Sequence, residues 1–167
     1  MIEFSNRICQ TLHKEHETNI ALLERVERLI ASHRNACPDA VDPLARQLIS
    51  EFASGLSAEV ERHFAFEERD LFPYLEARGS SDIGVHLTEE HSVIRPLVEA
   101  LARVARTAAG RGFDERSWNE FRRLGAELCD RLYSHIQKEE MALLPLVEES
   151  MDSETETRLY QDYLEIA

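Results

Sequence analysis

One sequence pattern occurs twice in this chain: residues 63–76 read HFAFEERDLFPYLE, and residues 135–148 read HIQKEEMALLPLVE. Both fit H-x-x-x-E-E-x-x-L-x-P-x-x-E. A second shared pattern, L-x-x-E-H, precedes each copy at residues 12–16 and 87–91. A regular repeat whose identities fall mainly on His and Glu predicts a metal site built from two helical hairpins.

The rest of the chain has the spacing of amphipathic helices. Few Gly or Pro residues interrupt it, which favours helices over a turn-rich β fold. Apolar residues recur at helical spacing over about residues 8–33, 42–77, 83–109 and 115–149, and residues 153–166 are expected to form a short final helix. Because the connections are short, we expect an all-α fold: an antiparallel up-down-up-down four-helix bundle with a C-terminal helical segment. Residues 1–167 would form one domain of two hairpin repeats, about 8–79 and 83–149.

Three prolines lie inside these helical patterns, at Pro73, Pro96 and Pro145. Proline removes a helix hydrogen bond, so each should kink its helix or force a local irregularity. Pro73 and Pro145 hold the same position in the repeat, which predicts matched kinks just beyond the two His-Glu motifs.

Composition excludes several classes of partner. The formal net charge of −13 argues against nucleic acid and against anionic membranes. No apolar run is long enough to span a bilayer, and the start of the chain, MIEF, lacks the features of a signal peptide. We therefore expect a cytoplasmic protein. Its three cysteines form no CxxC pair, which predicts reduced, mostly buried thiols.

The two motifs place metal-ligating side chains on shared helix faces. Residues four apart lie one turn from each other, so each motif can direct an imidazole and a carboxylate to one point. The two L-x-x-E-H patterns supply one further imidazole each. The predicted ligands are His16, His63, Glu67, His91, His135 and Glu139. This mixture suits iron, manganese or zinc, and bridging carboxylates would describe a dinuclear centre.

A simpler interpretation is that these are ordinary helix residues. A single His-x-x-x-Glu pair is often only an exposed ion pair. Two such pairs in register, with two further His at repeat positions, favour the metal site instead. Ferritin-like bundles use Glu-x-x-His on two helices and lone Glu on the others, so they do not fit this chain.

These residues resemble the hemerythrin-like, or HHE cation-binding, domains over about residues 16–148. The resemblance implies a four-helix bundle whose oxo- or hydroxo-bridged di-iron centre is held by the six residues above; zinc and manganese are the alternative metals. Two departures set the chain apart from oxygen-carrying members. Leu87 stands where they have a His, and Glu139 follows the last His by four residues rather than five.

Three other histidines are candidates for additional ligands: His33, His13 and His86. His33 is similar to a late His in the first helix of iron-sulfur repair relatives. His13 and His86 lie three and five residues before a predicted ligand, and the nonfunctional alternative for all three is a solvated helix surface.

The favoured function is a non-enzymatic di-iron protein that binds or senses O₂, NO or iron, or handles iron for repair. Its partner would then be a small diatomic ligand at the metal. One alternative is a di-iron oxidoreductase that consumes peroxide or NO, and another is a structural bundle that holds zinc. The sequence leaves a homo-oligomer or a protein partner open.

Overall fold

The computed structural model describes residues 4–34, 36–39 and 42–166. Three residues that belong to earlier predictions lie outside these ranges: Met1 at the start of the predicted domain, Asn35 in the first predicted loop and Ala167 at the domain's end. The described residues form helices and no strand, which confirms the all-α class. Within the same ranges, no helix combines the length and the apolar character needed to cross a membrane.

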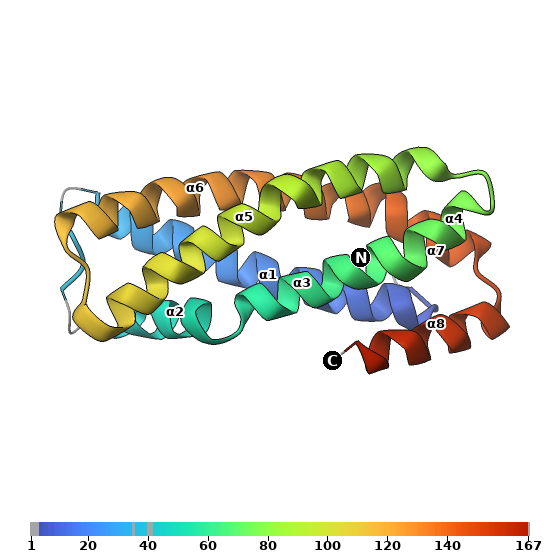
Figure 1. Cartoon of the computed structure of the whole chain (residues 1–167), viewed down its shortest axis with the longest axis horizontal. Helices are drawn as coiled ribbons and strands as arrows, with labels where there is room; N and C mark the ends of the chain where they lie inside the picture. Colours follow the sequence, from blue (N-terminus) through green and yellow to red (C-terminus); the bar gives the residue numbers. More distant parts are fainter. Residues whose placement is uncertain (1–3, 35, 40–41, 167) are drawn as a thin grey trace.

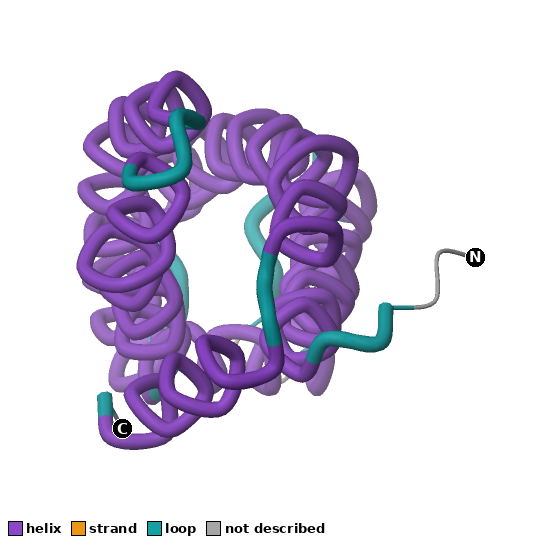
Figure 2. Tube along the Cα trace, turned by 90° about the vertical axis from the view of Figure 1, so that its right-hand side faces the viewer, coloured by secondary structure: helices purple, strands orange, loops and turns teal. Residues whose placement is uncertain are grey.

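The long helices lie side by side along one axis, and successive segments run in opposite directions (Figure 1). Viewed end-on, they surround a common axis (Figure 2). Buried apolar side chains from these segments form a core cluster. The elements are α1 (Arg7–Ser32), α2 (Pro43–Ser54), α3 (Leu56–Phe66), η1 (Glu67–Leu71), α4 (Phe72–Glu76), α5 (Ser81–Arg111), α6 (Glu115–Lys138), η2 (Glu139–Leu143), α7 (Leu144–Ser150) and α8 (Ser153–Glu165).

The second predicted helix is divided. It starts as expected, because the Asp42 side chain accepts hydrogen bonds from the backbone of Leu44 and Ala45 and a proline fills the first turn. It then ends at Ser54, and α3 begins at Leu56. Gly55 lies between them, where the lack of a side chain makes a continuous helix least favourable.

Both His-Glu motifs contain a π-helical segment, η1 and η2. In each, a backbone N–H donates to the carbonyl five residues back, from Phe72 to Glu67 and from Leu144 to Glu139. The irregularity therefore begins at the motif glutamate and precedes the proline, whereas we expected kinks beyond the motif. The wider turn accommodates a proline that has no N–H to donate and would clash with the carbonyl four residues earlier.

Two apolar clusters flank a buried polar layer. One cluster holds Phe52, Phe64 and Phe121, and the other holds Phe66 and Leu71. On each long segment the polar residues lie between side chains of the two clusters. Among the described residues, the buried polar side chains besides Asn6 are His16, His63, Glu67, His91, His135 and Glu139.

Candidate metal centre

The polar layer brings six imidazole and carboxylate side chains together. Their ligand atoms form two overlapping groups, and the atoms within each group lie within 4.8 Å of one another. One group comes from α1, α3 and η2 and the other from η1, α5, α6 and η2. Their members are His16, His63 and Glu139 in the first, and Glu67, His91, His135 and Glu139 in the second.

Glu139 is common to both groups and divides its two oxygens between them. Its Oε2 lies 2.6 Å from Nε2 of His16 and 3.5 Å from Nε2 of His63. Its Oε1 lies 2.6 Å from Nε2 of His135 and 4.0 Å from Nε2 of His91. Each oxygen of Glu139 therefore faces a different histidine pair. The first pair is His16 and His63, and the second pair is His91 and His135.

Glu67 repeats this arrangement. Its Oε1 lies 3.5 Å from Nε2 of His63, and its Oε2 lies 3.3 Å from Nε2 of His91. Both glutamates are 0% exposed. The two carboxylates thus span the same gap between the two histidine pairs.

Several of these atoms lack a hydrogen-bond partner within the described structure. Both carboxylate oxygens of Glu67 and of Glu139, and Nε2 of His16, are buried without one. Leaving a buried charge without a compensating partner is costly, and a coordinated cation is one of the ways in which proteins satisfy it. The donor atoms therefore fit a bound metal.

Each of the four histidines has a carboxylate at its other ring nitrogen. The Nδ1-to-oxygen pairs are His16 to Glu140 at 2.5 Å, His63 to Glu15 at 2.8 Å, His91 to Glu68 at 2.7 Å and His135 to Glu90 at 2.9 Å. A carboxylate here holds the proton on Nδ1, so the Nε2 lone pair faces the centre. In every pair the carboxylate comes from a different long segment than the imidazole, so the contacts form a closed ring around the bundle.

A basic side chain supports each outer carboxylate. These contacts are Arg62 to Glu15 at 2.7 Å, Arg95 to Glu68 at 2.9 Å, Lys138 to Glu90, and His13 Nδ1 to Glu140 at 2.9 Å. Burial alone would raise the pKa of each carboxyl, but hydrogen bonds from the imidazole and from the other partners outweigh it. The pKa therefore lies below its usual range for Glu15, Glu68, Glu90 and Glu140.

Aromatic rings pack against the second histidine pair, His91 and His135. The Phe64 ring stacks on His91 with centroids 3.7 Å apart and meets His135 edge-on at 5.3 Å. The Phe72 ring also stacks on His91, with ring centroids 5.9 Å apart. These apolar contacts exclude water and fix the ring planes of the second histidine pair.

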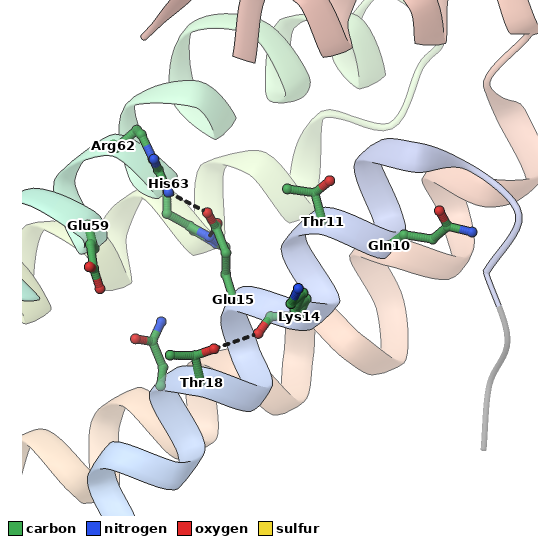
Figure 3. A pocket seen from close by; sticks show the side chains of 9 residues that line it. Gln10, Thr11, Lys14, Glu15, Thr18, Glu59, Arg62 and His63 are labelled. Carbon is green, nitrogen blue, oxygen red and sulfur yellow. Dashed lines mark hydrogen bonds and ion pairs between the residues drawn. The ribbon is translucent and has the colours of Figure 1, made fainter. Parts of the chain in front are cut away.

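A groove of about 520 Å³ opens beside the first histidine pair, between α1 and α3. Its walls include Lys14 and Glu15 from α1, and Glu59, Arg62 and His63 from α3 (Figure 3). His63 is part of this wall, so the groove borders the first histidine pair.

The three additional histidines do not join the two groups. His33 caps the C-terminal end of α1. Its Nε2 lies 3.4 Å from Asp42, and its Nδ1 lies 3.2 Å from the Leu29 carbonyl. It follows His16 by 17 residues on one helix, a separation of about 25 Å. His86 is exposed, with Nε2 3.4 Å from Glu90. His13 contacts the outer carboxylate Glu140.

Sequence reasoning missed the role of Glu15 and Glu90. Each directly precedes a histidine in L-x-x-E-H, and each contacts the histidine of the next long segment. Their recurrence in both halves was the available signal, but the motif alone does not reveal which histidine a neighbouring helix presents. Glu68 and Glu140 each follow an inner glutamate by one residue, which turns them about 100° around the helix to the outer positions.

Comparison with known proteins agrees with this geometry. The sequence model of the hemerythrin HHE cation-binding domain matches residues 7–147 and again residues 85–165. The comparison with curated proteins found no match. The longer match spans most of the chain, and with the buried His and Glu clusters it shows that this chain belongs to the hemerythrin HHE cation-binding domain family.

Proposed function

We propose that this protein holds a dinuclear iron centre and uses it to bind or sense a small diatomic molecule, O₂ or NO. The observation that carries the proposal is the division of each inner carboxylate between two histidine pairs. One ion would be held by His16 and His63, and the other by His91 and His135, with Glu67 and Glu139 shared. The antiparallel four-helix arrangement, as two hairpins of a single domain, supplies one histidine from each long segment.

The donor types support iron. Imidazole nitrogen and carboxylate oxygen suit iron, manganese and zinc, while the described groups contain no thiolate. Iron held by two imidazoles and two shared carboxylates would keep room for a small ligand, as other non-haem iron sites do. When bound, an iron pair supplies a redox-active centre with room for a small ligand.

The protein's own residues would orient, shield and balance this centre. The outer carboxylates hold each imidazole with Nε2 facing inward, and Phe64 and Phe72 keep water from the second pair. The groove beside His63 offers a small molecule a path toward the first pair.

The test uses reduced, iron-loaded protein under anaerobic conditions. Addition of O₂ or NO should change the visible spectrum, and removal of the gas should restore it. Glu139→Gln, which preserves size and removes the shared charge, should lose both irons and this response. Glu149→Gln, an exposed glutamate on α7, should behave like the wild type.

Three outcomes would overturn the proposal. Sustained consumption of peroxide or NO with a reductant would identify an oxidoreductase. Zinc in place of iron after purification from iron-supplemented cells would identify a structural bundle, because zinc brings no redox chemistry. Full iron content in Glu139→Gln would show that the ligand set is wrong.

A further inference from the structure

The C-terminal helix α8 reaches the outer ring of the candidate metal centre. The Tyr163 hydroxyl donates a hydrogen bond to Glu15, and the same carboxylate accepts from Nδ1 of His63. A continuous path therefore runs from the phenol through Glu15 to an imidazole of the first histidine pair. Because α8 lies beyond both hairpin repeats, this contact is an addition to the repeated design.

The second half of the centre is built differently at the equivalent position. Glu90 corresponds to Glu15 in the repeat, and it contacts Nδ1 of His135 at 2.9 Å. Its other described partners are the amine of Lys138 and the exposed imidazole of His86. The two halves thus share the carboxylate and the imidazole, but the phenol belongs to the first half.

The surroundings hold the phenol in place. Tyr163 is 6% exposed, and its ring meets Phe66 edge-on with centroids 5.1 Å apart. The Arg62 guanidinium lies 5.4 Å from the ring centre and 2.7 Å from Glu15. Burial and the nearby carboxylate raise the pKa of Tyr163 well above its usual range, so the phenol keeps its proton and acts as a donor.

We propose that Tyr163 is a positioning residue of the metal centre, which holds Glu15 against His63 and makes the first metal position different from the second. This inference rests on the proposed dinuclear function. A hydrogen bond to an ionised carboxylate is among the stronger ones, so it restricts where Glu15 can lie. Restricting Glu15 in turn fixes the direction of the His63 ring and its Nε2.

The consequence is a difference in how firmly the two metals are held. Changing a direct partner of a metal-ligating histidine costs about 10–100-fold in metal affinity. Tyr163 acts one contact farther out, so we expect its loss to speed release of one metal by roughly 3- to 10-fold. The metal held by His91 and His135 should leave at an unchanged rate.

The experiment loads full-length wild type, Tyr163→Phe and Tyr160→Phe with iron and follows metal release to an excess of chelator. Tyr160 is the matched control, because it lies on the same helix and packs its ring against Arg7. In Tyr163→Phe, about one of two metal equivalents should leave faster. Tyr160→Phe should release both at the wild-type rates.

Combination with Glu15→Gln separates positioning from simple packing. If Tyr163 acts through Glu15, the double variant should release the first metal no faster than Glu15→Gln alone, since residues in one network are not additive. Additive effects, equal acceleration of both metals, or wild-type release from Tyr163→Phe would each overturn the inference while leaving the dinuclear proposal intact. Wild-type protein that binds no iron would instead remove the proposed function, and this inference with it.

Discussion

At the scale of single residues, the centre depends on the direction of each imidazole. The presence of four histidines on helices does not by itself make a metal site. Here a carboxylate at every Nδ1 directs Nε2 inward. The motif H-x-x-x-E-E predicts the imidazole and the inner carboxylate, because these lie one turn apart on one helix. The outer contacts join different long segments, so they depend on how the helices pack.

Leu87 offers a residue-scale prediction, because it lies one turn before His91 and is fully buried. Leu87→His should place an additional imidazole toward the second histidine pair. Without metal, the buried polar ring should cost about 1–3 kcal/mol of stability. With iron bound, the visible spectrum should change relative to the wild type.

The control for this variant is Leu75→His, which buries the same group in the same apolar cluster but away from the ligands. It should lower stability and leave the spectrum unchanged. If the spectrum of iron-loaded Leu87→His equals that of the wild type, with and without oxygen, then position 87 does not face the metal.

At the scale of elements, the prolines explain why the two π-helical segments occur where they do. The sequence predicts an irregularity near Pro73 and Pro145 but does not determine its form. Pro96 differs from these two prolines, because α5 continues through it as one helix from Ser81 to Arg111. Gly55 was likewise visible in the sequence, yet the surrounding apolar spacing favoured a single helix.

Pro145→Ala should weaken metal binding without harming the fold. Alanine restores the N–H and removes the clash, so an ordinary α-helical turn becomes competitive with η2. That turn would rotate Glu139 relative to the residues that follow it. We expect faster iron release to a chelator and equal or higher thermal stability of the metal-free protein.

Pro96→Ala is the matched control, because Pro96 is exposed and no π-helical segment precedes it. Its iron release should equal that of the wild type. Unchanged release from Pro145→Ala would show that the π-helical turn does not serve the metal ligands.

At the scale of the whole molecule, metal and protons compete for the same buried imidazoles. Burial alone would lower the pKa of His91, but the nearby Glu139 and Glu67 carboxylates outweigh it and raise this pKa from 6.5 to about 9 in the metal-free protein. A raised folded-state pKa contributes stability in full below the unfolded value and loses it as pH rises through the folded value. Metal binding requires the neutral imidazole, so the affinity for metal increases as pH rises.

The metal-free and iron-loaded proteins should therefore respond to pH in opposite directions. From pH 6.5 to about 9, the metal-free protein should lose thermal stability as His91 loses its proton. Over the same range, the stabilisation that iron adds should grow. Thermal unfolding of both forms across this range would check the signs, and parallel curves would contradict the competition.

The sequence could predict the helical class, the repeat and the inner residues, because these follow from local spacing. It could not reveal that α8 carries Tyr163 to Glu15, since that contact joins residues 148 positions apart. The final helix was expected from its amphipathic pattern, but only the packed structure relates it to the site.

The central proposal is that the two histidine pairs would hold two irons, with Glu67 and Glu139 shared between them. Its decisive test is elemental analysis of wild-type protein purified from iron-supplemented cells. Two histidine pairs that face two shared carboxylates predict about two irons per chain. Zinc alone, or an intact fold with no metal, would contradict the claim.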